Sequence, residues 1–432
     1  MRFYIETYGC QMNQYDSRVV SSLLEREGWE RIDEWKEADF ILVNTCAVRQ
    51  HAEDRVFSRL GIWGKYKREK KPSLKIGILG CISQKEGENL IRRFPYLDLV
   101  AGTFVIPKIP QLVKEALEHQ VVAVEEELLE IPPPEIEEGA VTTFISVMRG
   151  CNNFCSYCIV PYVRGRERSR SPESVIEEVK KAVSEGVKEV VLLGQNVNSY
   201  RGFSVRDGRC VDFPELLKLV NKVEGLYRIR FATSHPKDLS DELIKAVKEL
   251  DKVCEHIHLP IQSGSNRILK LMNRKYTRED YLRLVEKIRK EIPEVSITTD
   301  IIVGFPGEGE KEFMETVSLV KEVEFDSAYI FKYSPRPFTS AYSLKDDVSK
   351  EEKERRLNYL LQLQKSISKK KNDIYVGKEV EVLVEKRERE GWFGRTRNHK
   401  SVIISSSLPL LGKLVKVKIV RNRKGILEGY FQ

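Results

Sequence analysis

Three cysteines, Cys151, Cys155 and Cys158, stand within eight residues of one another in a chain of 432 residues. Their spacing is Cys-x3-Cys-x2-Cys, and no further Cys or His follows between Ile159 and Ser199. Four thiolates complete the protein ligands of a four-iron cluster, whereas three leave one iron open to an outside ligand. The pattern therefore predicts an iron–sulfur cluster that binds a substrate or cofactor. The alternative is a zinc knuckle, which needs further ligands within about 12–20 residues.

A second set of cysteines, Cys10, Cys46 and Cys81, is spaced one strand–helix unit apart along the chain. Each of the three follows a predicted strand, and these strands cover residues 3–7, 40–44 and 75–79. Because the carboxyl ends of parallel strands meet at one edge of a sheet, we expect the three thiols to lie together there. Each also precedes a helix, whose N-terminus favours an anionic ligand such as a thiolate-ligated cluster. Three buried structural cysteines are the alternative.

The elements that must position these cysteines form an α/β fold. Residues 1–125 alternate strands and helices, which predicts a parallel sheet with covering helices. Residues 126–139 are acidic and contain three consecutive prolines, so they are read as a stiff linker. Residues 140–350 repeat the strand-then-helix pattern six times. This repetition predicts a partial TIM-like (β/α)6 barrel, with its site at the carboxyl ends of the strands.

The predicted barrel strands cover residues 144–148, 189–193, 228–232, 257–260, 297–303 and 328–333. Glycine-rich or polar loops follow them, among them Gly194-Gln195-Asn196, Gln262-Ser263-Gly264 and Gly304-Phe305-Pro306. Glycine permits a ligand to approach the backbone closely. Such loops also make ordinary turns, but six of them on one edge indicate a binding site.

The net charge of +8 is concentrated in residues 369–432, which hold 16 Lys and Arg against 7 Asp and Glu. A helix over residues 351–371 is predicted to lead into residues 372–432, whose apolar–polar alternation predicts a small OB-like β-barrel. A localised basic module indicates a nucleic-acid partner, although a solvated basic surface gives the same pattern. The candidate RNA contacts are Arg387, Arg389, Trp392, Phe393, Arg395, Arg397, Lys400, Arg421, Arg423 and Lys424. Trp392 and Phe393 equally fit a role in the core.

Composition excludes several classes of protein. Hydrophobic residues make up 41% of the chain, and no apolar run approaches the roughly 20 residues of a membrane-spanning helix. The start, Met1–Glu6, lacks the apolar segment of a signal peptide, so we expect a cytoplasmic protein without a membrane partner. Eight cysteines in a chain of this length do not make a disulfide scaffold, and metal binding is expected instead.

The cysteine motifs and their surroundings resemble a known family. The matching segments are Tyr8-Gly9-Cys10-Gln11-Met12-Asn13, and Arg149-Gly150-Cys151 through Cys158 to Arg170. Over its whole length the chain is similar to the methylthiotransferases of the radical S-adenosylmethionine (SAM) superfamily, and among them to the group that acts on N6-isopentenyladenosine in tRNA. The resemblance implies an N-terminal methylthiotransferase domain, a radical SAM barrel and a C-terminal TRAM domain. One departure is the segment Arg336–Ser340, where the family has Gly and Pro in place of Phe338 and Ser340.

The resemblance also implies roles for particular residues. Cys151, Cys155 and Cys158 would hold a 4Fe–4S cluster that binds SAM. Cys10, Cys46 and Cys81 would hold a second 4Fe–4S cluster that carries the sulfur to be delivered. The implied SAM pocket consists of Tyr157, Gly194, Gln195, Asn196, Gln262, Ser263, Gly264, Gly304, Phe305 and Pro306. The basic run Arg164–Arg170 either contacts phosphate or forms a solvated loop.

The implied reaction uses two SAM per turnover. One methylates the carried sulfur, and the other supplies the radical that abstracts hydrogen from C2 of an isopentenylated adenosine next to the anticodon. Because an aromatic C–H offers no acidic proton, no histidine or carboxylate is assigned a catalytic role. The implied partners of the monomer are the tRNA anticodon stem-loop, an electron donor and a sulfur source. The alternative substrates are threonylcarbamoyladenosine in tRNA and an aspartate of a ribosomal protein. A non-catalytic iron–sulfur RNA-binding sensor is the alternative from another class.

Overall fold

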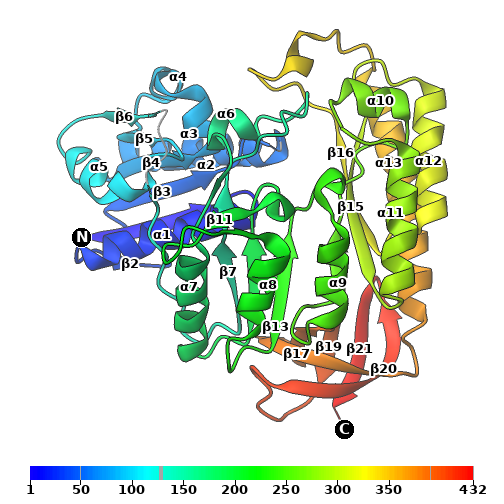
Figure 1. Ribbon diagram of the computed structural model, residues 1–432. Coiled ribbons are helices and arrows are strands. Elements are labelled where there is room, and N and C mark those ends of the chain that lie inside the picture. The colour runs from blue at the N-terminus through cyan, green and yellow to red at the C-terminus, as the bar shows by residue number, and fades with distance from the viewer. Residues whose placement is uncertain (49, 126–129, 390, 432) are drawn as a thin grey trace. The chain divides into compact units, whose positions relative to one another are not determined.

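The computed structural model describes residues 1–48, 50–125, 130–389 and 391–431 (Figure 1), so residues 126–129 of the predicted linker lie outside the described residues. The chain divides into two compact units. Unit 1 comprises residues 1–136, 149–153 and 158–168, and unit 2 comprises residues 137–148, 154–157 and 169–432. The cysteine-rich loop is therefore shared, because Cys151 and Cys158 belong to unit 1 and Cys155 belongs to unit 2.

Unit 1 is built on a parallel sheet with the strand order β2-β1-β3-β4-β5-β6, as its alternating pattern predicts. Its strands are β1 (Arg2–Thr7), β2 (Glu30–Arg31), β3 (Phe40–Thr45), β4 (Lys75–Gly80), β5 (Leu99–Ala101) and β6 (Val121–Ala123). Its helices are α1 (Gln11–Arg26), α2 (Gln50–Glu69), α3 (Cys81–Glu86), α4 (Glu88–Arg93), η1 (Ile106–Lys108), α5 (Ile109–Glu115) and α6 (Val160–Arg164). The central strand β3 is buried along its whole length, as expected for a parallel strand covered on both faces.

Two helix boundaries in unit 1 are set by local backbone conformation. Helix α1 begins at Gln11, because Cys10 adopts the extended conformation of an N-cap. Helices α3 and α4 are separate and short, since Gly87 lies between them with φ of 52°. The strands β2, β5 and β6 have two or three residues each, which is too short for periodicity to reveal.

The barrel of unit 2 has a strand at each of the six predicted positions. They form two parallel sheets of three strands, ordered β13-β10-β7 and β14-β15-β16, and a parallel bridge between Ile229 and Val253 lies between the sheets. The strands are β7 (Thr142–Ser146), β10 (Glu189–Leu193), β13 (Arg228–Ala232), β14 (His256–His258), β15 (Ser296–Val303) and β16 (Ser327–Lys332). Two short pairs accompany them, β8 (Met148–Arg149) with β9 (Arg168–Ser169), and β11 (Arg201–Phe203) with β12 (Cys210–Asp212).

Helices separate these strands, and Figure 1 shows α11, α12 and α13 running beside β15 and β16. The helices of unit 2 are α7 (Pro172–Ser184), η2 (Val197–Ser199), α8 (Phe213–Asn221), η3 (Pro236–Asp238), α9 (Asp241–Glu249), α10 (Asn266–Leu271), α11 (Arg278–Glu291), α12 (Glu310–Val323), η4 (Ser340–Ser343) and α13 (Lys350–Asp373). Across the described residues, none of the helices combines the length and apolarity that a bilayer crossing requires.

The C-terminal module is a closed β-barrel, as predicted. Its strands follow the order β17-β18-β19-β21-β20. They are β17 (Glu379–Glu388), β18 (Gly391–Arg395), β19 (Ser401–Ser405), β20 (Leu414–Arg423) and β21 (Ile426–Phe431). Alternate residues of each strand point inward, and Trp392 lies among them at 9% exposure, so this tryptophan is a core residue.

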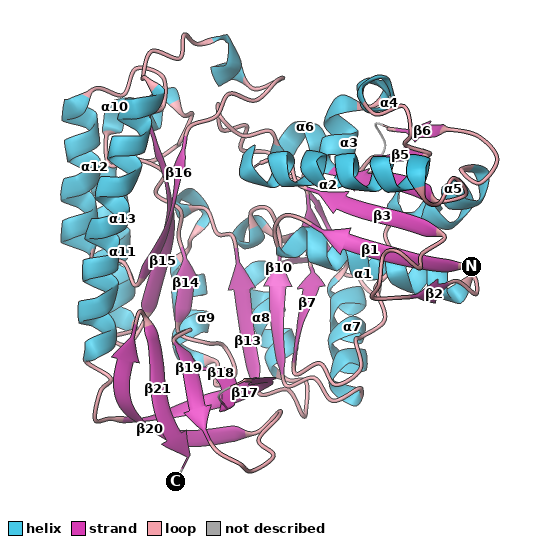
Figure 2. Cartoon of the chain, turned by 180° about the vertical axis from the view of Figure 1, so that it is seen from behind, coloured by secondary structure: helices cyan, strands magenta, loops and turns pink. Residues whose placement is uncertain are grey.

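This barrel lies against the amino ends of the unit 2 strands, on the side opposite to the arrowheads of β7, β10 and β13 in Figure 2. Arg228 and Arg230, at the start of β13, donate hydrogen bonds to the carbonyl groups of Arg395 and Thr396 (2.6 and 2.8 Å). Lys400 reaches Asp326, just before β16, at 2.7 Å. The carboxyl ends of the same strands carry the loops that the sequence indicates as a site.

Candidate cluster and cofactor site

The thiols Cys10, Cys46 and Cys81 stand at the carboxyl ends of β1, β3 and β4, which are neighbours in the sheet of unit 1. Gly9, with φ of +143°, lets the chain pass close to Cys46, because a Cβ on Gly9 would lie 2.8 Å from the Cys46 Cβ. The charge of Cys10 acts on the Cys81 thiol. The predicted gathering of the three cysteines at one sheet edge is therefore what the structure describes.

Amide side chains tie the three strand ends together. Asn13 donates from Nδ2 to the Thr45 carbonyl (2.9 Å), and Cys10 Sγ lies 3.2 Å from Asn13 Oδ1. Asn44 donates from Nδ2 to the Asn13 carbonyl (3.0 Å), and Thr45 Oγ1 donates to the Leu79 carbonyl (2.6 Å). This buried network fixes where each thiol stands, because satisfied polar networks specify a single arrangement.

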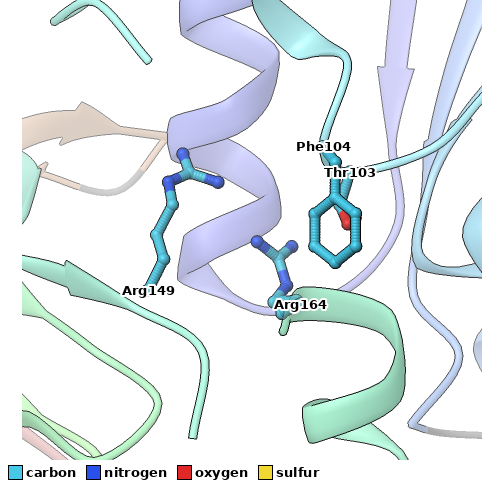
Figure 3. Close-up of a pocket in the computed structure, with 4 residues that line it drawn as sticks. All are labelled: Thr103, Phe104, Arg149 and Arg164. Carbon is cyan, nitrogen blue, oxygen red and sulfur yellow. The ribbon is translucent and has the colours of Figure 1, made fainter. Parts of the chain in front are cut away.

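Two buried arginines share one carboxylate beside these thiols. Arg149 Nη2 lies 2.5 Å from Asp16 Oδ1, and Arg164 Nη1 lies 2.9 Å from Asp16 Oδ2. Figure 3 shows both guanidinium groups extending toward the same helix, with Thr103 and Phe104 beside Arg164. Burial disfavours the charge of Arg164, but Cys81 and Asp16 together with Cys10 raise its pKa. Burial raises the pKa of the Cys81 thiol, and the Arg164 guanidinium acts in the opposite direction.

The unit 1 part of the Cys151–Cys158 loop is held by backbone contacts. The Cys151 amide donates to the Gly165 carbonyl (3.1 Å). Gly150, with φ of +77°, passes so close to Arg166 that a Cβ there would stand 2.1 Å from its carbonyl oxygen. Asn152 and Glu167 each accept a hydrogen bond from the other's backbone amide, at 3.3 and 3.2 Å.

The unit 2 part of the loop, residues 154–157, is fixed to the turn after α10. The Ser156 amide donates to the Met272 carbonyl (3.0 Å), and Asn273 Nδ2 donates to the Phe154 carbonyl (2.9 Å). Arg274, at 8% exposure, lies 3.4 Å from Cys155 Sγ through Nη1. Burial disfavours its charge, yet Tyr276, Tyr157 and Cys155 raise the pKa of Arg274.

Within the described ranges, no three His, Cys, Asp or Glu side chains converge on one ion-sized position. The cysteines of a four-iron cluster bind different irons, so they do not converge on one point as the ligands of a single zinc ion do.

Comparison with known proteins agrees with this geometry. The family model of the radical SAM superfamily matches residues 145–320, the uncharacterized protein family UPF0004 matches residues 2–102, and the TRAM domain matches residues 373–431. The tRNA-2-methylthio-N(6)-dimethylallyladenosine synthase of Caldicellulosiruptor saccharolyticus is 49% identical over 435 residues, covering 99% of this chain and 92% of that protein. The enzyme of that name from Carboxydothermus hydrogenoformans is 48% identical, covering 99% and 98%. The chain belongs to the tRNA-2-methylthio-N(6)-dimethylallyladenosine synthase family.

Members of this family are radical SAM enzymes, so the chain uses SAM and a 4Fe–4S cluster. Among solved structures, the radical SAM methyltransferase TsrM from Kitasatospora setae superposes with a TM-score of 0.57 at 15% identity, covering 79% of this chain and 75% of that one. The radical SAM enzyme OxsB superposes with a TM-score of 0.52 at 15% identity, covering 84% and 56%. These similarities show the fold alone.

The residues predicted to line the SAM pocket of this family member follow β10, β14 and β15. Gly264 is required by packing, because a Cβ there would lie 2.6 Å from the Glu315 carbonyl oxygen of α12. The missing side chains of Gly194 and Gly304 similarly make room for Met148 and Lys353. Phe305 is fully buried against Tyr333, in a cluster that Tyr157 joins. The other predicted positions are Gln195, Asn196, Gln262, Ser263 and Pro306, and the SAM contacts of the whole set stay a prediction.

His235 is buried at the carboxyl edge of unit 2, and its burial together with the charges of Arg274 and Lys237 lowers its pKa to about 2. It is therefore neutral and serves as an acceptor for the Lys237 amide (3.2 Å). The expectation that no histidine is catalytic stays a prediction.

Two of the residues predicted to contact RNA, Arg397 and Lys400, have protein partners in the structure. Lys400 is 6% exposed and paired with Asp326, and Arg397 donates to Glu255 and to the carbonyls of Asp251 and Val253. These two side chains hold the TRAM barrel on the unit 2 strands. Arg395 lies 3.1 Å from Glu385 and remains half-buried. The exposed candidates are Arg387, Arg389, Arg421, Arg423 and Lys424.

The basic run Arg164–Arg170, for which phosphate contact and a solvated loop were the two alternatives, is mixed: Arg166 and Arg168 are exposed, whereas Arg164 and Arg170 have protein partners. Arg164 is 4% exposed, and Arg170 pairs with Glu178 and donates to the Ser146 carbonyl. Sequence reasoning missed Asp16 and Arg274 altogether. Asn13 and Arg149 lie in the two motifs that carry the family resemblance. The sequence therefore drew attention to these positions, but it did not indicate their contacts.

Proposed function

We propose that this protein methylthiolates C2 of N6-isopentenyladenosine adjacent to the anticodon in tRNA, with two SAM per turnover. The observation that carries the proposal is the gathering of Cys10, Cys46 and Cys81 at one edge of the unit 1 sheet, in a chain that also contains a separate Cys-x3-Cys-x2-Cys loop. Each set supplies three thiolates, which leaves one iron of a cluster open to a ligand from outside. The names of the relatives specify the tRNA substrate.

The residues at the sheet edge of unit 1 fit a thiolate-ligated cluster. Three soft thiol ligands are present, Cys46 Sγ receives the Val48 amide at 3.4 Å, and Arg164 Nη1 and Nη2 are buried without an acceptor in hydrogen-bond geometry. Hydrogen bonds and cations around the sulfurs stabilise an anionic cluster. We therefore assign a second 4Fe–4S cluster to Cys10, Cys46 and Cys81.

The chemistry supplied by the bound cofactors is one-electron cleavage of SAM, which yields a radical able to abstract hydrogen from an unactivated C–H bond. The contribution of the protein is to hold the cluster ligands in position. Cys155 is held by the hydrogen bonds of residues 154–157 to the turn after α10, and Arg274 keeps a positive charge against its sulfur. The enzyme also requires an electron donor and a sulfur source, and we propose that it acts as a monomer.

Exposed cations of the TRAM barrel are proposed to bind the tRNA backbone. Replacing Arg421, Arg423 and Lys424 together by glutamine should weaken RNA binding at low salt. The reason is that each phosphate contact releases counterions, so the slope of log affinity against log salt should become shallower by about 2 for three contacts to single-stranded RNA. Fluorescence anisotropy with an anticodon stem-loop at several salt concentrations measures this slope.

A matched control removes three positive charges from helices of unit 2 that are distant in sequence from the barrel. It replaces Lys245 and Lys248 of α9 and Lys287 of α11 by glutamine. The control should leave the slope unchanged. An equal loss of slope in both variants would mean that binding responds to net charge and not to a barrel surface.

The activity test is anaerobic reconstitution with iron and sulfide, followed by incubation with SAM, a reductant and isopentenylated anticodon stem-loop RNA. Nucleoside mass spectrometry should detect the 2-methylthio product at the modified adenosine. Parallel reactions with threonylcarbamoylated RNA and with a ribosomal protein test the two alternative substrates. A tightly bound cluster without SAM cleavage would support the sensor instead.

A further inference from the structure

Arg164 is a buried cation, and two of its side-chain nitrogens lack a hydrogen-bond acceptor. It is the last residue of α6 and is 4% exposed. Its Nη1 lies at ion-pair distance from Asp16 Oδ2, but neither Nη1 nor Nη2 meets an acceptor with the angles of a hydrogen bond. Leaving buried guanidinium donors unpaired is costly. These donors therefore indicate an anion beside Cys81, the thiol against which Arg164 lies.

Arg274, the arginine beside the other cysteine set, provides a contrast. Its Nε donates to the Tyr276 hydroxyl (2.8 Å), its Nη2 donates to the Pro260 carbonyl (2.9 Å) and its Nη1 faces Cys155. All three of its nitrogens thus have protein partners. Arg164 is set up differently, because its protein partners are the Asp16 carboxylate and the Cys81 thiol.

The charges around Arg164 sum to a positive value. Asp16 is 1% exposed and carries one negative charge, whereas Arg149 and Arg164, its two partners, carry one positive charge each. The Asp16 carboxylate lies within ion-pair distance of both guanidinium groups, so its charge attracts both. The net positive charge lies in a buried environment, where screening by water and salt is weak.

On these grounds we propose that Arg164 is a positioning residue for the anionic group held by Cys10, Cys46 and Cys81, and that Asp16 sets the local charge. The inference rests on the second cluster of the proposed function. Adding one electron makes a thiolate-ligated cluster more negative, so a buried cation favours the reduced form and a buried anion disfavours it. Arg164 and Asp16 therefore change the reduction potential of this cluster in opposite directions.

The experiment uses the full-length chain with Cys151, Cys155 and Cys158 replaced by alanine, reconstituted anaerobically so that only the unit 1 cluster remains. Redox titration with dithionite, followed by electron paramagnetic resonance, gives its midpoint potential. In this background Arg164→Gln should move the midpoint to a more negative value, and Arg164→Lys should move it less. Asp16→Asn, which keeps the side-chain size, should move it to a more positive value.

The matched control is Arg92→Gln, which removes the same charge from an exposed position of unit 1 and should leave the midpoint unchanged. If Arg164→Gln does not fold by circular dichroism, Arg164→Lys and Asp16→Asn decide the question. Midpoints of Arg164→Lys and Asp16→Asn equal to that of the parent, with full iron content, would overturn the inference. A parent that holds no cluster would instead overturn the second cluster of the proposed function.

Discussion

Replacing Cys46 by alanine should abolish the 2-methylthio product while SAM is still cleaved to 5′-deoxyadenosine. Cys46 is 3% exposed at the end of β3, and its thiol accepts the Val48 amide, so the variant lacks one of the three thiolate ligands assigned to the second cluster. The Cys-x3-Cys-x2-Cys loop does not include Cys46, and its cluster should remain. Loss of one product with retention of the other therefore separates sulfur delivery from SAM cleavage.

The measurement is simultaneous quantification of 5′-deoxyadenosine by liquid chromatography and of modified nucleoside by mass spectrometry, together with iron content. Cys155→Ala should abolish both products. Cys210→Ala is the matched control, since Cys210 is an exposed thiol outside both cysteine sets, and it should leave both products unchanged. A Cys46→Ala enzyme that still thiolates RNA would contradict the assignment of the second cluster.

Replacing Asp326 by asparagine should loosen the TRAM barrel from unit 2. The Asp326 carboxylate lies 2.7 Å from Lys400 of the barrel and 2.8 Å from Lys371 of α13, and it accepts the Ile297 amide at 3.0 Å. Removing one partner of a buried ion pair typically costs about 3–5 kcal/mol, because the remaining charge stays buried and uncompensated. Hydrogen exchange should therefore speed up in the strands β17–β21. Asp373→Asn, which breaks an exposed pair with Lys369, is the control and should change little.

The same carboxylate predicts a dependence of stability on pH. Burial alone would raise the pKa of Asp326, but the ammonium groups of Lys400 and Lys371 outweigh it and lower the pKa below its ordinary value. A lowered pKa in the folded state means that the stabilisation is present above the ordinary carboxyl pKa and is lost as the pH falls through the folded value. Thermal unfolding of Asp326→Asn should thus vary less with pH below about 4 than unfolding of the unmodified protein. Equal acid sensitivity of both proteins would contradict this role.

Long apolar strands could be predicted from the sequence, and with them the meeting of Cys10, Cys46 and Cys81. The bounds of β10 and β13 match their predicted ranges, although only β10 ends in the continuous hydrophobic run typical of a buried parallel strand, and β13 carries two arginines. The positions of the three cysteines could then be predicted, because each cysteine follows the carboxyl end of a predicted strand. The site residues that act through contacts, such as Asp16 and Arg274, have no local pattern and depend on tertiary packing.

The surroundings of charged residues were the hardest to predict. Lys400 and Arg397 look like surface cations in the sequence, yet their partners Asp326 and Glu255 lie far away along the chain.

At Phe338 the sequence departs from the family pattern, but the backbone conformation does not. Phe338 has φ of 69°, so the backbone keeps the left-handed conformation that the family's glycine would favour, although the residue has changed.

The position of the TRAM barrel at the amino ends of the unit 2 strands sets a minimum reach for the substrate. Strand β15 alone has eight residues and so extends about 26 Å between its two ends. If the barrel binds the tRNA as proposed, the RNA must extend at least that far to present a base at the opposite rim. A free nucleoside or a trinucleotide is too short to reach both places at once, whereas a folded stem-loop with its flanking helix is long enough. The proposed function thus implies that the substrate must be a structured RNA of sufficient length.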